Sequence, residues 1–155
     1  MHKTIRIGSV RMWASIRKVE DIKGMCSNTN SGKHILMWDF DGTTFGRVSV
    51  SLRIIQERCQ LPKITILETK AGCNFIAYCF EELEWEDALA IVLDTDGVCW
   101  NFFRLSVIRG YFTLRVSPKG GRIPYFRAEI PGKSPQKITV DDLVHAINYE
   151  TSKVR

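Results

Sequence analysis

The spacing of apolar and polar residues predicts a chain of short strands interrupted by a few amphipathic helices. Residues 4–16 alternate loosely between the two kinds, which predicts a strand or one arm of a hairpin. The polar run 27–33 predicts a turn or loop. The apolar run 35–38 that follows predicts a buried strand, which ends in two aspartates, Asp39 and Asp41.

The next segment predicts a helix and then a hairpin. Four apolar residues recur at the spacing of one helical face: Val48, Leu52, Ile55 and Cys59. A Leu-Pro pair at 61–62 ends this helix. The β-rich runs 63–69 and 75–80, joined by a short connection with a glycine, predict the two strands of a hairpin.

The second half of the chain continues the same mixture. Residues 81–95 predict an amphipathic helix with acids in its first turn, where the helix dipole favours them. Residues 101–109 predict a short helix, with a strand as the alternative. Residues 111–117 alternate as a strand does, 118–122 form a flexible basic turn, and 122–130 predict a returning strand.

This order of elements predicts an α+β fold, a mainly antiparallel sheet with helices packed on it. The tail, 131–155, is predicted to be a loop and a helix that Thr139 caps. Its apolar residues are Val140, Leu143, Val144 and Ile147. We expect one domain, with a basic strand and loop segment at 1–33 and a core at 34–130. Two helices interleaved with strand pairs would suit a ferredoxin-like or RNA-recognition-motif-like core.

Composition predicts the compartment in which the protein works. The 155 residues contain no apolar run long enough to span a bilayer and no signal peptide, so we expect a cytoplasmic protein without membrane contact. Five cysteines without a CxxC pair argue against a disulfide framework and a zinc knuckle.

Charge is distributed unevenly along the chain. Residues 1–33 carry seven Lys/Arg against two acids, and 101–137 carry eight against one, whereas 34–100 hold eleven acids against five bases. Two basic segments of this kind favour a polyanionic partner, because Lys and Arg neutralise phosphates. A solvated basic surface is the alternative.

Asp39 and Asp41 are the first candidates for chemistry. Positions i and i+2 of a strand face the same side, so both carboxylates would face one spot and could hold Mg²⁺ or Mn²⁺. The alternative is a strand followed by an ordinary Asp-Gly turn.

The run Asp39-Phe40-Asp41-Gly42-Thr43 resembles the opening of haloacid-dehalogenase-type phosphatases. That resemblance implies a nucleophile at Asp39, a general acid/base at Asp41 and a parallel sheet. The chain departs from the family further on, because hairpins replace the repeated strand-helix units, and the acids at 141–142 begin a predicted helix.

Residues 34–122 also resemble the archaeo-eukaryotic primase-polymerase superfamily, as a diverged member of the plasmid- and virus-borne replication type. The resemblance lies in the DxD strand, in TKAGCNFIAYCF and in RGYFTLRVSPKGGR. It implies an RNA-recognition-motif-like core, metal ions at Asp39 and Asp41, and nucleotidyl transfer. Asn74 stands where the family has a histidine, and Val98-Cys99-Trp100 where it has a third carboxylate.

A second constellation carries positive charge. Arg109, Arg115, Ser117, Lys119 and Arg122 could bind the phosphates of a nucleotide or nucleic acid. Tyr111, Phe112 and Tyr125 could stack on bases. In the alternative, these arginines pair with the acids of 81–96 and the aromatic residues belong to the core. His34 and His145 are interpreted as structural.

The leading hypothesis is therefore a replication-associated, primase-polymerase-like domain that binds nucleotides and a single-stranded or template nucleic acid. Asp39 and Asp41 would hold Mg²⁺ or Mn²⁺, and Asn74 with the basic residues would hold phosphates. The alternatives are a non-catalytic nucleic-acid-binding module and a phosphatase of the DxDGT type. The two missing motif residues favour the binding module, whereas the DxD pair favours catalysis.

Overall fold

The computed structural model describes residues 2–7, 10–15, 19–144 and 146–152, and their side chains within 21–144 and 146–147. Its strands are β1 (His2–Ile7), β2 (Val10–Ser15), β3 (Val19–Cys26), β4 (His34–Asp41), β5 (Ile64–Lys70), β6 (Asn74–Leu83), β7 (Thr113–Arg115), β8 (Tyr125–Ile130) and β9 (Ala146–Ser152). Its helices are α1 (Phe45–Cys59), α2 (Trp85–Leu93) and α3 (Trp100–Arg109), with a short 3₁₀ helix η1 (Val140–Asp142).

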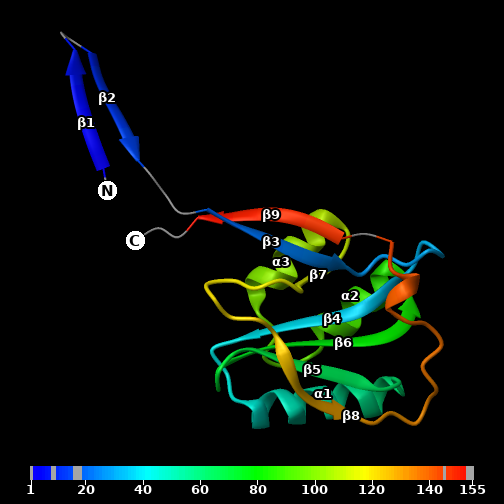
Figure 1. The fold of residues 1–155 in the computed structure, drawn as a ribbon. Coiled ribbons are helices and arrows are strands. Elements are labelled where there is room, and N and C mark those ends of the chain that lie inside the picture. Colours follow the sequence, from blue (N-terminus) through cyan, green and yellow to red (C-terminus); the bar gives the residue numbers. More distant parts are fainter. Residues whose placement is uncertain (1, 8–9, 16–18, 145, 153–155) are drawn as a thin grey trace.

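The strands form three separate antiparallel sheets. The largest has the order β4-β6-β5-β8, a second has the order β7-β3-β9, and β1 pairs with β2 alone (Figure 1). The fold is thus α+β and antiparallel, as predicted. The parallel sheet that the phosphatase resemblance implies does not occur among the described strands.

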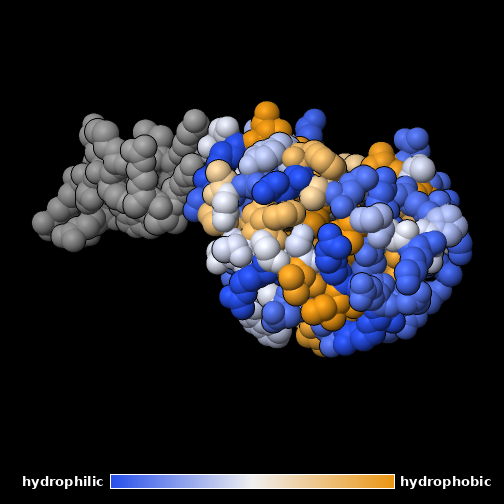
Figure 2. Space-filling view, turned by 90° about the horizontal axis from the view of Figure 1, so that it is seen from below, coloured by the Kyte–Doolittle hydropathy of each residue, from blue (hydrophilic) through white to orange (hydrophobic). Residues whose placement is uncertain are grey.

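The core forms where the helices cover one face of the four-stranded sheet. In β4, Leu36, Trp38 and Phe40 are almost completely buried, and the Trp38 indole donates a 3.0 Å hydrogen bond to the Thr95 hydroxyl. In α1, Val48 and Leu52 are buried, and they lie on the helical face that their spacing in the sequence predicts. The polar surface in Figure 2 is interrupted by apolar patches.

Most predicted elements are confirmed. The hairpin of β5 and β6, the helix α1 and the short helix α3 occur where the pattern placed them, and β1 pairs with β2 as two antiparallel strands. The helix predicted over 81–95 is shorter, because 81–83 continue β6. No helix in the described part of the chain is long and apolar enough to cross a membrane.

The helix predicted after Thr139 is wrong. Thr139 is the N-cap, as predicted, and forms a capping box with Asp142, but only the one turn of η1 follows. Residues 146–152 instead form β9, which pairs with residues 19–25 of β3. Cross-strand pairing with β3 outweighs the local helical pattern. His145 lies outside the described residues.

β3 has no counterpart among the predicted elements. Its residues 19–26 lack strict alternation, and two acids and a glycine interrupt the apolar positions. It is nevertheless the central strand of its sheet, since β7 and β9 pair with its two edges. This strand brings the basic turn after β7 into a fixed position.

Candidate functional site

The acidic pair lies at the end of an edge strand of the larger sheet. Asp39 is partly buried and Asp41 is exposed, and they stand opposite Ile76 and Asn74 in the register of β4 with β6. The i and i+2 spacing puts both aspartates on the same side of β4. This side carries the candidate site.

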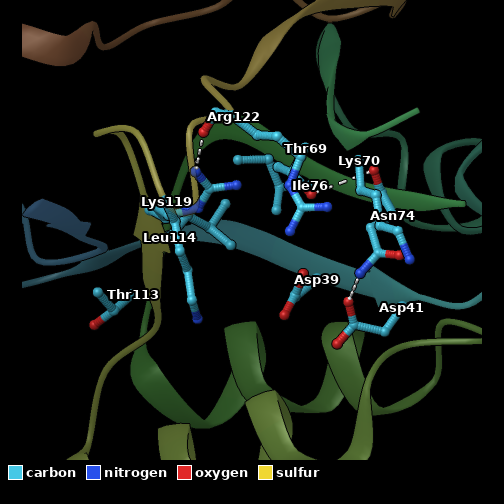
Figure 3. A pocket seen from close by; sticks show the side chains of 11 residues that line it. Asp39, Asp41, Thr69, Lys70, Asn74, Ile76, Thr113, Leu114, Lys119 and Arg122 are labelled. Atoms are coloured by element: carbon cyan, nitrogen blue, oxygen red, sulfur yellow. Dashed lines mark hydrogen bonds between the residues drawn. The ribbon is translucent and has the colours of Figure 1, made fainter. Parts of the chain in front are cut away.

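Asn74 secures the outer carboxylate. Its side-chain amide donates a hydrogen bond to Oδ1 of Asp41 (Figure 3). The Thr43 amide also donates to the Cys73 carbonyl at 2.9 Å, so the turn before β6 holds the end of β4 twice. Asn74 is thus in direct contact with Asp41, at the position where the primase resemblance implies a histidine.

Cys99 joins the two acids from a separate element. Its backbone amide donates a 2.7 Å hydrogen bond to the Asp39 carbonyl, which fixes the start of α3 against the edge of β4. One ligand atom from each of Asp39, Asp41 and Cys99 lies within 4.8 Å of the others. Two carboxylates and a thiol at such distances could hold a divalent ion.

A cavity of about 250 Å³ opens beside the acid pair. It is lined by Asp39, Asp41, Thr69, Lys70, Asn74, Ile76, Thr113, Leu114, Arg115, Lys119 and Arg122 (Figure 3). The lining comes from both larger sheets and from the turn after β7. The cavity therefore combines two carboxylates with four cationic side chains.

The basic turn is held in shape by its own backbone. Lys119 and Arg122 exchange two backbone hydrogen bonds of 2.9 and 3.2 Å. Gly120 and Gly121 between them both have positive φ, which residues with a side chain rarely adopt. The Arg115 guanidinium donates 2.9 Å hydrogen bonds to the carbonyls of Ser117 and Arg122, so this residue stabilises the turn as well as lining the cavity.

The carboxyl group of Asp39, the more buried of the two acids, has a high affinity for its proton. Burial of Asp39, together with repulsion from Asp41, raises the pKa of its carboxyl group to about 7. The cations of Arg115 and Lys119 oppose that rise. Burial, with a contribution from the neighbouring carboxylates, likewise raises the pKa of the Cys99 thiol. A bound cation would favour the deprotonated forms of both groups.

The structure brings together six of the eight predicted site residues. Arg109 lies outside the cavity at the exposed end of α3. Ser117 is also outside, and its hydroxyl accepts a 2.8 Å hydrogen bond from the Lys23 amide, which ties the basic turn to β3. Ser117 thus has a structural role, and Arg109 is exposed outside the cavity.

The cavity and its acid cluster also contain residues that were not predicted as site residues: Thr69, Lys70, Ile76, Cys99, Thr113 and Leu114. Cys99 had a signal in the sequence, because it follows Gly97 where the resemblance implies a third carboxylate. Lys70 and Thr69 precede the turn before Asn74 and had none. Their position depends on the pairing of β5 with β6.

The alternative interpretations were that the arginines pair with the acids of 81–96 and that the aromatic residues belong to the core, and they hold for some residues only. Among the described acids of 81–96, Glu84 pairs with Lys33 at 3.4 Å and Asp94 pairs with Arg58, neither of them a cavity arginine. Phe112 is fully buried against Trp85 and Phe102, so it belongs to the core and cannot stack on a base. His34 is buried against Ser27 and Trp85, as its structural interpretation requires.

Comparison with known proteins adds no further information, since no family model, curated protein or solved structure matches the chain.

Proposed function

We propose that the chain is a nucleotide- and nucleic-acid-binding domain of the primase-polymerase type, whose phosphate-binding site is the cavity between β4 and the turn after β7. One observation carries this proposal. The acids of β4 and the cations of 115–122, far apart in the sequence, line the same cavity together with Lys70. Phosphate groups need such cations, and a divalent ion beside the acids completes the set.

The residues at the acid end fit a divalent ion. Asp39 and Asp41 supply two carboxylates, Cys99 supplies a sulfur, and Asn74 orients Asp41 through its amide. When bound, a divalent cation would supply the counter-charge that draws a phosphate oxygen to the carboxylates. Arg115, Lys119 and Arg122 would then hold the remaining phosphate oxygens from the opposite wall.

Binding ranks ahead of catalysis in this proposal. Transfer by two metal ions requires several oxygen ligands held in a fixed arrangement. Here Cys99 occupies the place of the third carboxylate and Asn74 the place of the motif histidine, and an amide cannot become a cation. On this proposal, the cavity offers cations that would bind a nucleotide phosphate, and it lacks two of the groups that a nucleotidyl transferase would use.

A nucleotide titration tests this function. Binding of a nucleoside triphosphate in the presence of Mn²⁺, measured by calorimetry, should be strong in the wild type and lost in Asp39→Asn/Asp41→Asn. Lys137→Ala is the matched control, because this lysine is exposed and lies outside the cavity. Equal affinity with Mn²⁺ and with a chelator, unchanged in the double variant, would rule out the acid pair as the nucleotide site.

A further inference from the structure

The hairpin of β1 and β2 carries different residues on its two faces. Its register pairs Arg6 with Arg11 and Thr4 with Trp13, and alternate positions of paired strands share a face. The face of Arg6, Arg11 and Trp13 also includes Thr4, His2 and Ser15. The other face holds Lys3, Ile5, Ile7, Val10, Met12 and Ala14. The ribbon thus has one polar, basic face and one apolar face.

The two arginines of the basic face destabilise the pairing of β1 with β2 in the isolated protein. Arg6 and Arg11 occupy directly opposed positions, and like charges at such positions destabilise a strand pair. Residues 1–18 contain five Lys/Arg and no acid that could offset them. A two-stranded hairpin is marginally stable by itself. An anionic partner between the two arginines would remove the repulsion and stabilise the ribbon.

We propose that the ribbon of β1 and β2 is a second nucleic-acid-binding element, which lies in the major groove of B-form DNA with the face that carries Arg6, Arg11 and Trp13. The major groove is about 12 Å wide and admits a two-stranded ribbon. Each strand has six residues, which at about 3.4 Å per residue gives roughly 20 Å of contact. Arginines there bind phosphates or guanine, and the smaller polar residues can reach base edges.

The position of Trp13 distinguishes DNA from a lipid surface. A ribbon that inserts its apolar face into a membrane would be expected to carry its tryptophan on that face. Trp13 instead occupies a register position on the face of Arg6 and Arg11. The residue distribution therefore favours duplex DNA over anionic lipid.

This second element is separate from the cavity. In the described part of the chain, the strong contacts of β1 and β2 are with each other, and Figure 1 draws the hairpin apart from the two larger sheets. The cavity residues come from 39–122. Duplex binding by the ribbon consequently needs neither a divalent ion nor the acid pair, and it can hold even where the proposed cavity function fails.

Fluorescence anisotropy with a labelled 20-base-pair duplex tests the ribbon in the full chain. In Arg6→Gln/Arg11→Gln, we expect affinity to fall at least tenfold and the dependence of log K on log salt to become shallower by about 0.9 for each lost phosphate contact. Lys137→Ala, an exposed lysine outside both the ribbon and the cavity, should leave duplex binding unchanged. The melting temperature of the part formed by the three-stranded and four-stranded sheets should also stay constant, because the substitutions lie outside these two sheets.

Lys3→Gln is the matched control, since it removes a positive charge from the opposite face of the same ribbon. It should reduce affinity less than Arg6→Gln does. An equal loss in both variants would mean that net charge alone acts, and the proposed face would be wrong. Unchanged affinity and salt slope in the double arginine variant, or binding to phosphatidylserine vesicles without binding to the duplex, would overturn the proposal.

Discussion

At the scale of single residues, the thiol in the acid cluster is the most informative feature. Mg²⁺ prefers oxygen ligands alone, whereas sulfur favours softer ions. Cys99 therefore makes the site a poorer one for Mg²⁺ than three carboxylates would be. The sequence indicated the two aspartates, and the resemblance implied a third carboxylate where this chain has Val98-Cys99-Trp100. It could not show that Cys99 lies beside the two acids, because that depends on the docking of α3 against β4.

Cys99→Asp should improve Mg²⁺ binding. A third carboxylate supplies the hard oxygen ligand that the wild type lacks, and we expect a gain of about 1.4 kcal/mol, or tenfold in affinity, by isothermal titration calorimetry. Cys99→Ser is the control, because it keeps the size of the side chain without adding charge. Identical Mg²⁺ affinity in all three proteins would remove position 99 from the metal site.

Asp39 should affect stability in a pH-dependent way. Its pKa is raised from 3.8 to about 7, so the metal-free native state retains a proton that the unfolded state loses, and stability declines as pH rises from about 4 to about 7. Without metal, Asp39→Asn should therefore melt at a higher temperature than the wild type at pH 8, with a smaller difference at pH 5. A difference that is constant across this range would show that the carboxyl group is not perturbed.

At the scale of elements, the strength of the local pattern separates the correct predictions from the wrong ones. α1 was predictable because four apolar residues define a single face, and β4 because an apolar run is followed by acids at alternate positions. The C-terminal strand was not, because Thr139 and two acids do form a capped turn before the chain turns to β3. Here the partner strand decides the structure, and a one-dimensional pattern does not contain it.

Ala146→Val tests the assignment of β9. Ala146 is exposed and stands opposite Met25, so a β-branched residue there should stabilise the strand by up to about 1 kcal/mol in urea unfolding. Ala90→Val is the control in α2, also exposed, where the same change should destabilise by up to about 0.7 kcal/mol. Destabilisation at both positions would favour the helix that the sequence first predicted.

At the scale of the whole molecule, the candidate site exists because two sheets meet. The four-stranded sheet provides the acids, Asn74 and Lys70, whereas the three-stranded sheet and its turn provide Arg115, Lys119 and Arg122. The 2.9 Å hydrogen bond from the Ile35 amide to the Ser27 carbonyl links β4, which carries the acids, to the residue that follows β3. The residue types could be read from the sequence, but their convergence required β3, which no local pattern predicted.

The most direct test of the central claim is the salt dependence of single-stranded DNA binding with Mn²⁺ present. It is best measured in the Arg6→Gln/Arg11→Gln background, where the ribbon contributes least. Lys119 is exposed and lines the cavity. In this background Lys119→Ala should weaken binding and reduce the slope of log K against log salt by about 0.7, because one phosphate contact is lost. Lys137→Ala should leave both unchanged. Equal affinity and equal slope in these two variants would contradict the assignment of the cavity as the phosphate-binding site.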